Sequence, residues 1–269
     1  CLTLIFFLVM MISNPVFSEV IDPRLELIEN TKDLRYADLK HMDLKNKDLS
    51  GADLYGANLS GADLYGANLS GADLTNAKLF GAVLQYAILT DAILNNADLS
   101  GANIYEADFE NDDLNGASLR HTYSYKTKFF NAILTNTDFS SANFCGQLLS
   151  GKDLSGSNFS DVDLQRANLS YANLTKTILT GADLREATLQ GANISGNDLS
   201  NVLLSGANLS NANLANTILI GTDLRNVNLT NAVLTNADLS NALLHGADLT
   251  NATTDGIILT NADYVTELP

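Results

Sequence analysis

The stretch GADLYGANLSGADLYGANLS, residues 51–70, contains one ten-residue segment twice, and each segment consists of two versions of a five-residue word. A period of five matches neither the 3.6-residue period of an α-helix nor the two-residue period of a β-strand. The word therefore predicts a chain that turns a corner at every repeat. The register holds from Leu34 to Tyr264, and nearly every fifth residue is Leu, Ile or Phe; the departures are Ser124, Thr254 and Tyr264.

Each place in the word has a physical role. The large apolar residue and the Ala two places before it point to the same side of an extended segment, so we expect both in the interior. The Asp or Asn between them faces outward. The fifth place, commonly Gly or Asn, tolerates the positive φ of a tight turn. Four such corners make a square coil of about twenty residues, and stacked coils pair their backbones at roughly 4.8 Å.

These A(D/N)LXX words resemble the signature of the pentapeptide-repeat family over residues 32–264. The resemblance implies an all-β fold, a right-handed quadrilateral parallel β-helix of about twelve coils. It also implies an alternative function, because some members of that family look like a DNA duplex in width and charge. Those members bind type II topoisomerases in place of DNA and protect gyrase from inhibitors.

Residues 1–18 predict a partial secretory signal peptide. They contain the apolar run LTLIFFLVMMI, which is too short to span a bilayer of roughly 30 Å as a helix. Val16 and Ser18 occupy the minus-three and minus-one places of a cleavage point before Glu19. The alternative interpretation is an apolar strand or helix that packs on one end of the rod. With a signal, we expect an exported protein (periplasmic, extracellular or on the cell surface) with no stable membrane span after the signal is removed.

Two short segments flank the repeats. Residues 19–31 are expected to cap the first coil with a short helix, because Asp22 and Pro23 suit an N-cap and first helical position. Residues 265–269 form a C-terminal tail. Cys145 is then the only thiol of the mature chain, so no internal disulfide is expected.

Charge and motifs exclude several function classes. The chain has 31 acidic against 15 basic residues, a net charge of −16, which disfavours nucleic acid and anionic membranes as partners. His41, His121 and His245 lie far apart and have no partners at metal-ligand spacing. Columns of Asp are typical of a solvated repeat face. We therefore predict no catalytic, cofactor-binding or metal-binding residues, no cofactor, and no enzymatic activity.

A candidate protein-binding face follows from the twenty-residue coil, because residues twenty apart stack on one side. One such column, together with its neighbours, collects Tyr and Arg, the residue types that most often anchor interfaces. The alternative is that these outward places vary freely, since Tyr suits a β surface. The candidate residues are Tyr65, Tyr86, Tyr105, Tyr123, Tyr125, Lys126, Arg166, Arg185 and Arg225.

Two further patterns interrupt the regular words. Residues 119–132, LRHTYSYKTKFFNA, gather positive charge and place Ser124 at a core position, which indicates either a mid-rod recognition girdle or one degenerate coil. Outward Ile and Leu recur every forty residues, at Ile178, Ile218 and Ile258 and at Leu203 and Leu243. Duplication explains this spacing, and the alternative is an apolar ladder for lateral association.

The sequence thus favours a non-catalytic exported scaffold whose outer faces bind a protein partner of unknown identity. A second copy of the chain is the other candidate partner, through lateral contact or end-to-end contact of exposed backbone edges. The alternative function is the DNA mimicry that the family resemblance implies, against which the signal peptide argues, because an exported protein does not meet gyrase.

Overall fold

The computed structural model describes Ile28 and residues 31–263. The chain divides into two compact units, Cys1–Thr31 and Lys32–Pro269. The predicted signal peptide and the predicted tail lie outside the described residues. Within the predicted capping segment, residues 19–31, the structure describes only Ile28 and Thr31. Ile28 is helical and buried. The short capping helix therefore stays a prediction.

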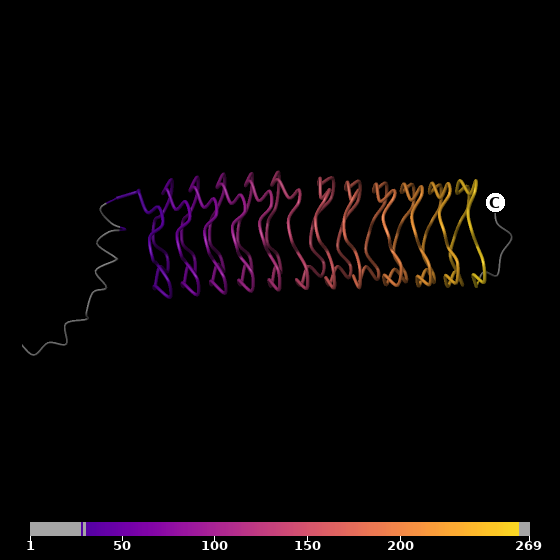
Figure 1. Ribbon diagram of the computed structural model, residues 1–269, viewed down its shortest axis with the longest axis horizontal. Coiled ribbons are helices and arrows are strands. Elements are labelled where there is room, and N and C mark those ends of the chain that lie inside the picture. Colours follow the sequence, from indigo (N-terminus) through magenta and orange to yellow (C-terminus); the bar gives the residue numbers. More distant parts are fainter. Residues whose placement is uncertain (1–27, 29–30, 264–269) are drawn as a thin grey trace, which may run out of the picture. The chain divides into compact units, whose positions relative to one another are not determined.

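The described repeats, residues 32–263, form a stack of square coils that follow one another along a single axis (Figure 1). Parallel one-residue bridges join positions twenty apart, beginning with Asp33 and Asp53 and ending with Leu243 and Asp263. The backbone continues this ladder; Leu34 N–H, for example, donates to Asp53 O at 2.8 Å. The fold is therefore all-β and parallel with twenty residues in each coil, as the five-residue word predicts. Among the described residues, no helix is long and apolar enough to cross a membrane.

The core is a column of large side chains with Ala between them. The Leu places are almost completely buried, and so are the Ala places, since the square interior has no room for eight large side chains in each layer. In the middle of the rod, several of the large buried side chains are phenylalanines instead of Leu, in stacked or edge-to-face pairs with ring centroids 4.9 to 5.9 Å apart. These are Phe109, Phe129, Phe139, Phe144 and Phe159.

Every corner of the coil has a positive φ. All residues at the fifth place from Tyr36 to Asn261 have φ between 52° and 76°. The prediction for Gly and Asn is confirmed, and the fold extends it to Tyr, His, Lys, Glu and Arg. A side chain with a Cβ is strained in this region. Packing and the backbone ladder therefore impose the corner geometry even where the residue does not favour it.

The outward Asp or Asn has a role that the word alone did not reveal. Its Oδ1 accepts the backbone N–H of the residue two places on, as Asp48 does from Ser50 at 3.0 Å and Asn68 does from Ser70 at 3.1 Å. The side chain thereby satisfies a donor at the turn, which is the usual role of Asx residues. The acidic surface is thus partly a by-product of how the turns are made.

The stretch 119–132 continues the coil without an insertion. Tyr123 pairs with Asn103 on one side and with Asn143 on the other. Ser124 is fully buried, and its hydroxyl donates to Asn143 O at 2.7 Å. A hydroxyl at this core place is therefore paired with backbone, and the stretch keeps the fold of its neighbours.

Candidate protein-binding surface

Five of the predicted tyrosines form one continuous aromatic cluster along a corner of the rod. The rings of Tyr65 and Tyr86 lie 5.3 Å apart, and those of Tyr86 and Tyr105 lie 5.6 Å apart, both edge to face. Tyr105 stacks on Tyr123 at 6.4 Å and on Tyr125 at 5.9 Å. We call these five residues the aromatic corner. Such contacts stabilise one another and hold the rings in place.

The aromatic corner is accessible and carries polar groups at its edge. Tyr65, Tyr86, Tyr123 and Tyr125 are each between 40% and 48% exposed. Lys126 Nζ lies 5.6 Å from the centre of the Tyr125 ring and 3.3 Å from Glu106 Oε1. Hydrogen bonding to the Glu106 carboxylate, followed by desolvation, raises the pKa of Tyr105 to about 12. The Tyr105 hydroxyl is thus engaged with the Glu106 carboxylate and stays protonated well above neutral pH.

The predicted arginines do not join this cluster as free cations. Arg185 forms an ion pair with Asp183 at 2.6 Å, and Arg225 forms the equivalent pair with Asp223 at 2.6 Å. Arg166 binds Glu186 of the next coil at 2.8 Å. Exposed pairs of this kind add little stability, but they neutralise the arginine charge. The predicted face therefore divides into an aromatic part that is available for binding and a basic part that is paired within the chain.

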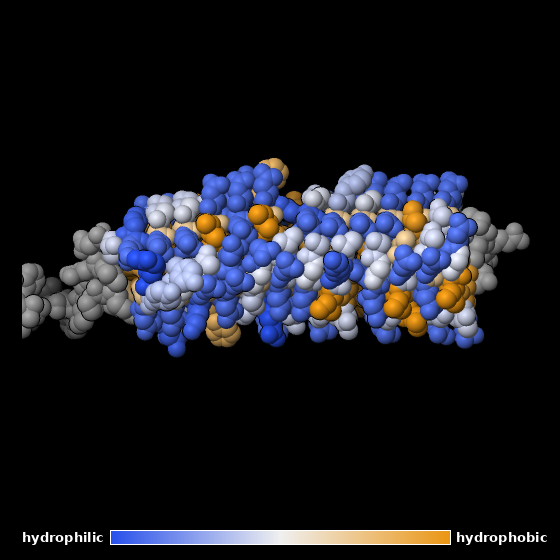
Figure 2. Space-filling view, turned by 45° about the horizontal axis from the view of Figure 1, so that its top comes forward, coloured by the Kyte–Doolittle hydropathy of each residue, from blue (hydrophilic) through white to orange (hydrophobic). Residues whose placement is uncertain are grey.

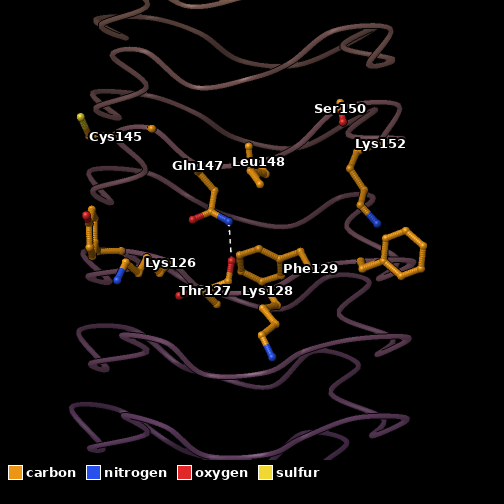
Figure 3. Close-up of a pocket in the computed structure, with 12 residues that line it drawn as sticks. Lys126, Thr127, Lys128, Phe129, Cys145, Gln147, Leu148, Ser150 and Lys152 are labelled. Carbon is orange, nitrogen blue, oxygen red and sulfur yellow. Dashed lines mark hydrogen bonds between the residues drawn. The ribbon is translucent and has the colours of Figure 1, made fainter.

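A cleft next to the aromatic corner was missed by the sequence analysis. It has a volume of about 600 Å³ and opens between two consecutive coils, with Tyr125, Lys126 and Cys145 on its wall toward the aromatic corner. Gln147 and Lys152, which stand at two successive Ala places, lie between the coils (Figure 3). Two bulky polar residues in consecutive Ala places mark this stretch in the sequence, but they do not by themselves show that the coils separate.

A second, smaller hollow lies on the other side of Lys126. It measures about 520 Å³ and is lined by Tyr86, Ile88, Glu106 and Asp108 among others. Lys128 pairs with Asp108 at 2.8 Å, so the charges in this hollow are balanced. The aromatic corner thus lies beside two concave regions, which is typical of a surface that receives a partner's side chains.

Among the residues that the structure describes, no group of His, Cys, Asp or Glu could hold a metal ion. Cys145 is a half-buried free thiol, and burial, with a smaller effect of Asp163, raises its pKa above the ordinary value. A thiol of raised pKa is a weak nucleophile.

The outward Ile and Leu residues lie where the forty-residue spacing placed them. Ile178, Ile218 and Ile258 are 52%, 41% and 48% exposed, and Leu203 and Leu243 are exposed to a similar degree. Figure 2 shows separate apolar patches among polar side chains, rather than one continuous apolar surface. Isolated exposed apolar residues are normal on soluble proteins, so duplication remains the simpler explanation.

Comparison with known proteins identifies one family of repeats in this chain. The family model for pentapeptide repeats matches eight copies within residues 33–71, 72–111, 113–144, 137–170, 167–206 and 207–246. No curated protein matched the chain. Among solved structures, HetL, a pentapeptide repeat protein involved in heterocyst differentiation regulation from the cyanobacterium Nostoc sp. strain PCC 7120, is 33% identical. That match covers 83% of this chain and 92% of HetL, with a TM-score of 0.45.

Two other solved structures are similar over less of the chain or at lower identity. Rfr23, a pentapeptide repeat protein from the cyanobacterium Cyanothece 51142, is 40% identical over 38% of this chain and 58% of its own, with a TM-score of 0.23. QnrB1, a plasmid-mediated fluoroquinolone resistance protein, is 18% identical over 79% of this chain and 91% of its own, with a TM-score of 0.35.

Proposed function

Since this chain belongs to the pentapeptide-repeat family, whose members form right-handed quadrilateral β-helices, we propose that it is an exported, non-catalytic scaffold that binds a protein partner through the aromatic corner. The continuous tyrosine cluster supports this proposal most directly. Tyrosines give a large contact area at low entropic cost and are enriched at the centres of protein interfaces.

The charges of the rod favour a protein over nucleic acid as the partner. The net charge is −16, and the cations nearest the aromatic corner, Lys126 and Lys128, are already paired with Glu106 and Asp108. Binding of a nucleic acid backbone requires cations that are free to replace counterions. The aromatic rings therefore offer stacking and hydrogen bonding without the charge that nucleic acid needs.

Replacing Tyr105, Tyr123 and Tyr125 together by Ser is expected to abolish partner capture while the fold is retained. These rings lie on the surface, so their loss removes contacts with the partner but leaves the buried Leu and Ala places intact. Capture from an extract of the cell envelope, compared between wild type and variant by quantitative mass spectrometry, measures the effect. Circular dichroism checks the fold.

A matched control is available in another column of the rod, half a coil away from Tyr65. Tyr36 and Tyr55 form a similar edge-to-face pair at 5.5 Å, outside the aromatic corner. The variant with both replaced by Ser should capture the partner as wild type does. Equal capture by the wild type and the triple variant would contradict the proposal.

Export is tested separately by the mass of the mature N-terminus after expression of the full-length protein. The proposal expects a mature chain that begins near Glu19 and lies outside the cytoplasm. A second candidate function, DNA mimicry toward a type II topoisomerase, is favoured by the net charge of −16. An uncleaved cytoplasmic protein would contradict export, and a supercoiling assay with gyrase would then test the mimicry.

A further inference from the structure

The backbone ladder is interrupted at the cleft. In residues 33–263, bridges join outward positions that are twenty residues apart, and three of these bridges are missing. Two of the missing bridges lie on adjoining words: Lys128 does not pair with Leu148, and Ile133 does not pair with Asp153. The N–H groups of Leu148 and Asp153, which elsewhere in the ladder would donate to the preceding coil, have no acceptor within the described residues. The two coils are therefore separated over ten residues, and the cleft is the space between them.

The cause of the separation is the size of two side chains. Gln147 and Lys152 stand at Ala places, where most coils carry Ala or another short side chain such as Thr. Each takes over one bond of the missing ladder: Gln147 Nε2 donates to Thr127 O at 2.6 Å, and Lys152 Nζ donates to Ala132 O at 3.3 Å. Figure 3 shows the Gln147 bond across the opening. The third missing pairing lies between Ile178 and Asp198, where the buried Asn197 occupies the Ala place.

The charge in the cleft is not balanced. Lys126 and Lys128 also line it, but each is paired with a carboxylate outside it. Among the described residues, no carboxylate lies within ion-pair distance of Lys152, and its Nζ bonds there only to the backbone carbonyl of Ala132. Burial lowers the pKa of Lys152 below its ordinary value. An ammonium that is half-buried and lacks a counterion attracts an anion into a site of reduced dielectric.

The walls of the cleft are apolar beside this cation. Phe130 and Leu148 are 65% and 69% exposed, although their residue types favour burial, and Phe129 forms the inner wall. A volume of about 600 Å³ lies within the range of small-molecule sites, which combine apolar walls with a few placed polar groups. The amides of Leu148 and Asp153 add donors next to Lys152.

We propose that the cleft between residues 124–134 and 144–154 binds a small organic carboxylate, whose anionic group contacts Lys152 and whose apolar body packs on Phe130 and Leu148. Charge complementarity selects the carboxylate, because Lys152 is the cation in this cleft that has no acidic partner in the described part of the chain. The site uses different residues from the five tyrosines that carry most of the proposed partner surface, apart from Tyr125 at its edge. It therefore stands or fails independently of the proposed function.

The test uses 2-naphthoate and its neutral analogue 2-naphthamide as probes, with the full repeat protein and isothermal titration calorimetry. We expect the carboxylate to bind at least tenfold more tightly than the amide. The Lys152→Met variant, which keeps an apolar stem of similar length, should lose this preference. The Lys176→Met variant removes an exposed lysine of the next coil that does not line the cleft and should bind like wild type.

A second variant tests the opening itself. Gln147→Ala combined with Lys152→Ala restores the usual Ala places, so the ladder should close and binding of both probes should be lost. Circular dichroism and thermal unfolding show that each variant is folded. The proposal is overturned if the wild type does not bind 2-naphthoate, or if Lys152→Met or the double Ala variant binds it as wild type does.

Discussion

Replacing Asp112 by Ala is expected to raise the free energy of unfolding at pH 8 by a few kcal/mol. Asp112 stands at an Ala place and has no exposed surface. Its Oδ1 accepts the Ala92 N–H at 2.9 Å, but its Oδ2 has no hydrogen-bond partner among residues 31–263 and Ile28. Burial, opposed by this one bond and reinforced by Asp108 and Asp91, raises the pKa of Asp112 to about 8. A buried and incompletely paired carboxyl is costly in its charged form.

The stabilising effect of Asp112→Ala should depend on pH, because the pKa of Asp112 differs between the folded and the unfolded chain. Between the unfolded pKa of 3.8 and the folded pKa of about 8, the folded chain keeps the proton that the unfolded chain releases. The contribution of Asp112 to stability therefore falls as pH rises, by about 1.4 kcal/mol for each pH unit, and is lost above pH 8. The gain from Asp112→Ala should be small at pH 4 and largest above pH 8.

Urea unfolding of wild type and variant at pH 4, 6 and 8 measures this difference. The matched control is Asp98→Ala, which removes an outward carboxylate that accepts one hydrogen bond, from Ser100 N–H at 3.0 Å. That change should lower the free energy of unfolding slightly at pH 8, by about 1 kcal/mol. A variant at position 112 that is less stable than wild type at pH 8 would show that the buried carboxyl has a partner that stabilises its charged form.

Replacing Phe144 by Ala is expected to lower the free energy of unfolding by about 3 to 5 kcal/mol, because a buried aromatic ring leaves a cavity. Phe144 is 1% exposed, and its ring lies 5.0 Å from Phe139 and 5.9 Å from Phe129. It connects aromatic residues of two coils in the region where the ladder is interrupted. In a stack of repeats, stability depends on contacts between neighbouring units, so this loss should affect the whole middle of the rod.

Chemical denaturation followed by circular dichroism tests the effect of Phe144→Ala. Phe144→Leu restores the residue that most coils have at this place and should cost less than Phe144→Ala. Phe80→Ala removes a ring that is 60% exposed and should change stability by no more than about 0.5 kcal/mol. If Phe144→Ala and Phe80→Ala had the same effect, the aromatic stack would not support the core.

The fold could be predicted from the sequence because each word is nearly the same. The five-residue period fixed the corners, the interior Leu and Ala places and the twenty-residue coil, which the bridges confirm. It also predicted that Tyr65 and Tyr105 lie near Tyr86 and Tyr125, because residues twenty apart stack. The aromatic corner follows from this register alone.

The details of the surface depend on which side chain occupies each place of the word, and the five-residue period alone does not distinguish these side chains. Arg225 lies two residues after Asp223, on the same side of an extended segment, so their ion pair could have been foreseen from the alternation. The cleft could not be deduced in the same way, since a Gln or Lys at an Ala place can turn outward or separate the coils. Only packing shows that Gln147 and Lys152 do the latter.

The outward Asx residues have a consequence for how this chain can evolve. Their Oδ1 atoms accept the same backbone N–H whether the residue is Asp48 or Asn68. An exchange of Asp for Asn, which needs a change of one base in the codon, therefore alters the charge of a face and keeps the turn. Natural selection can redraw the electrostatic pattern of the rod, and with it the choice of partner, one position at a time without passing through an unfolded intermediate.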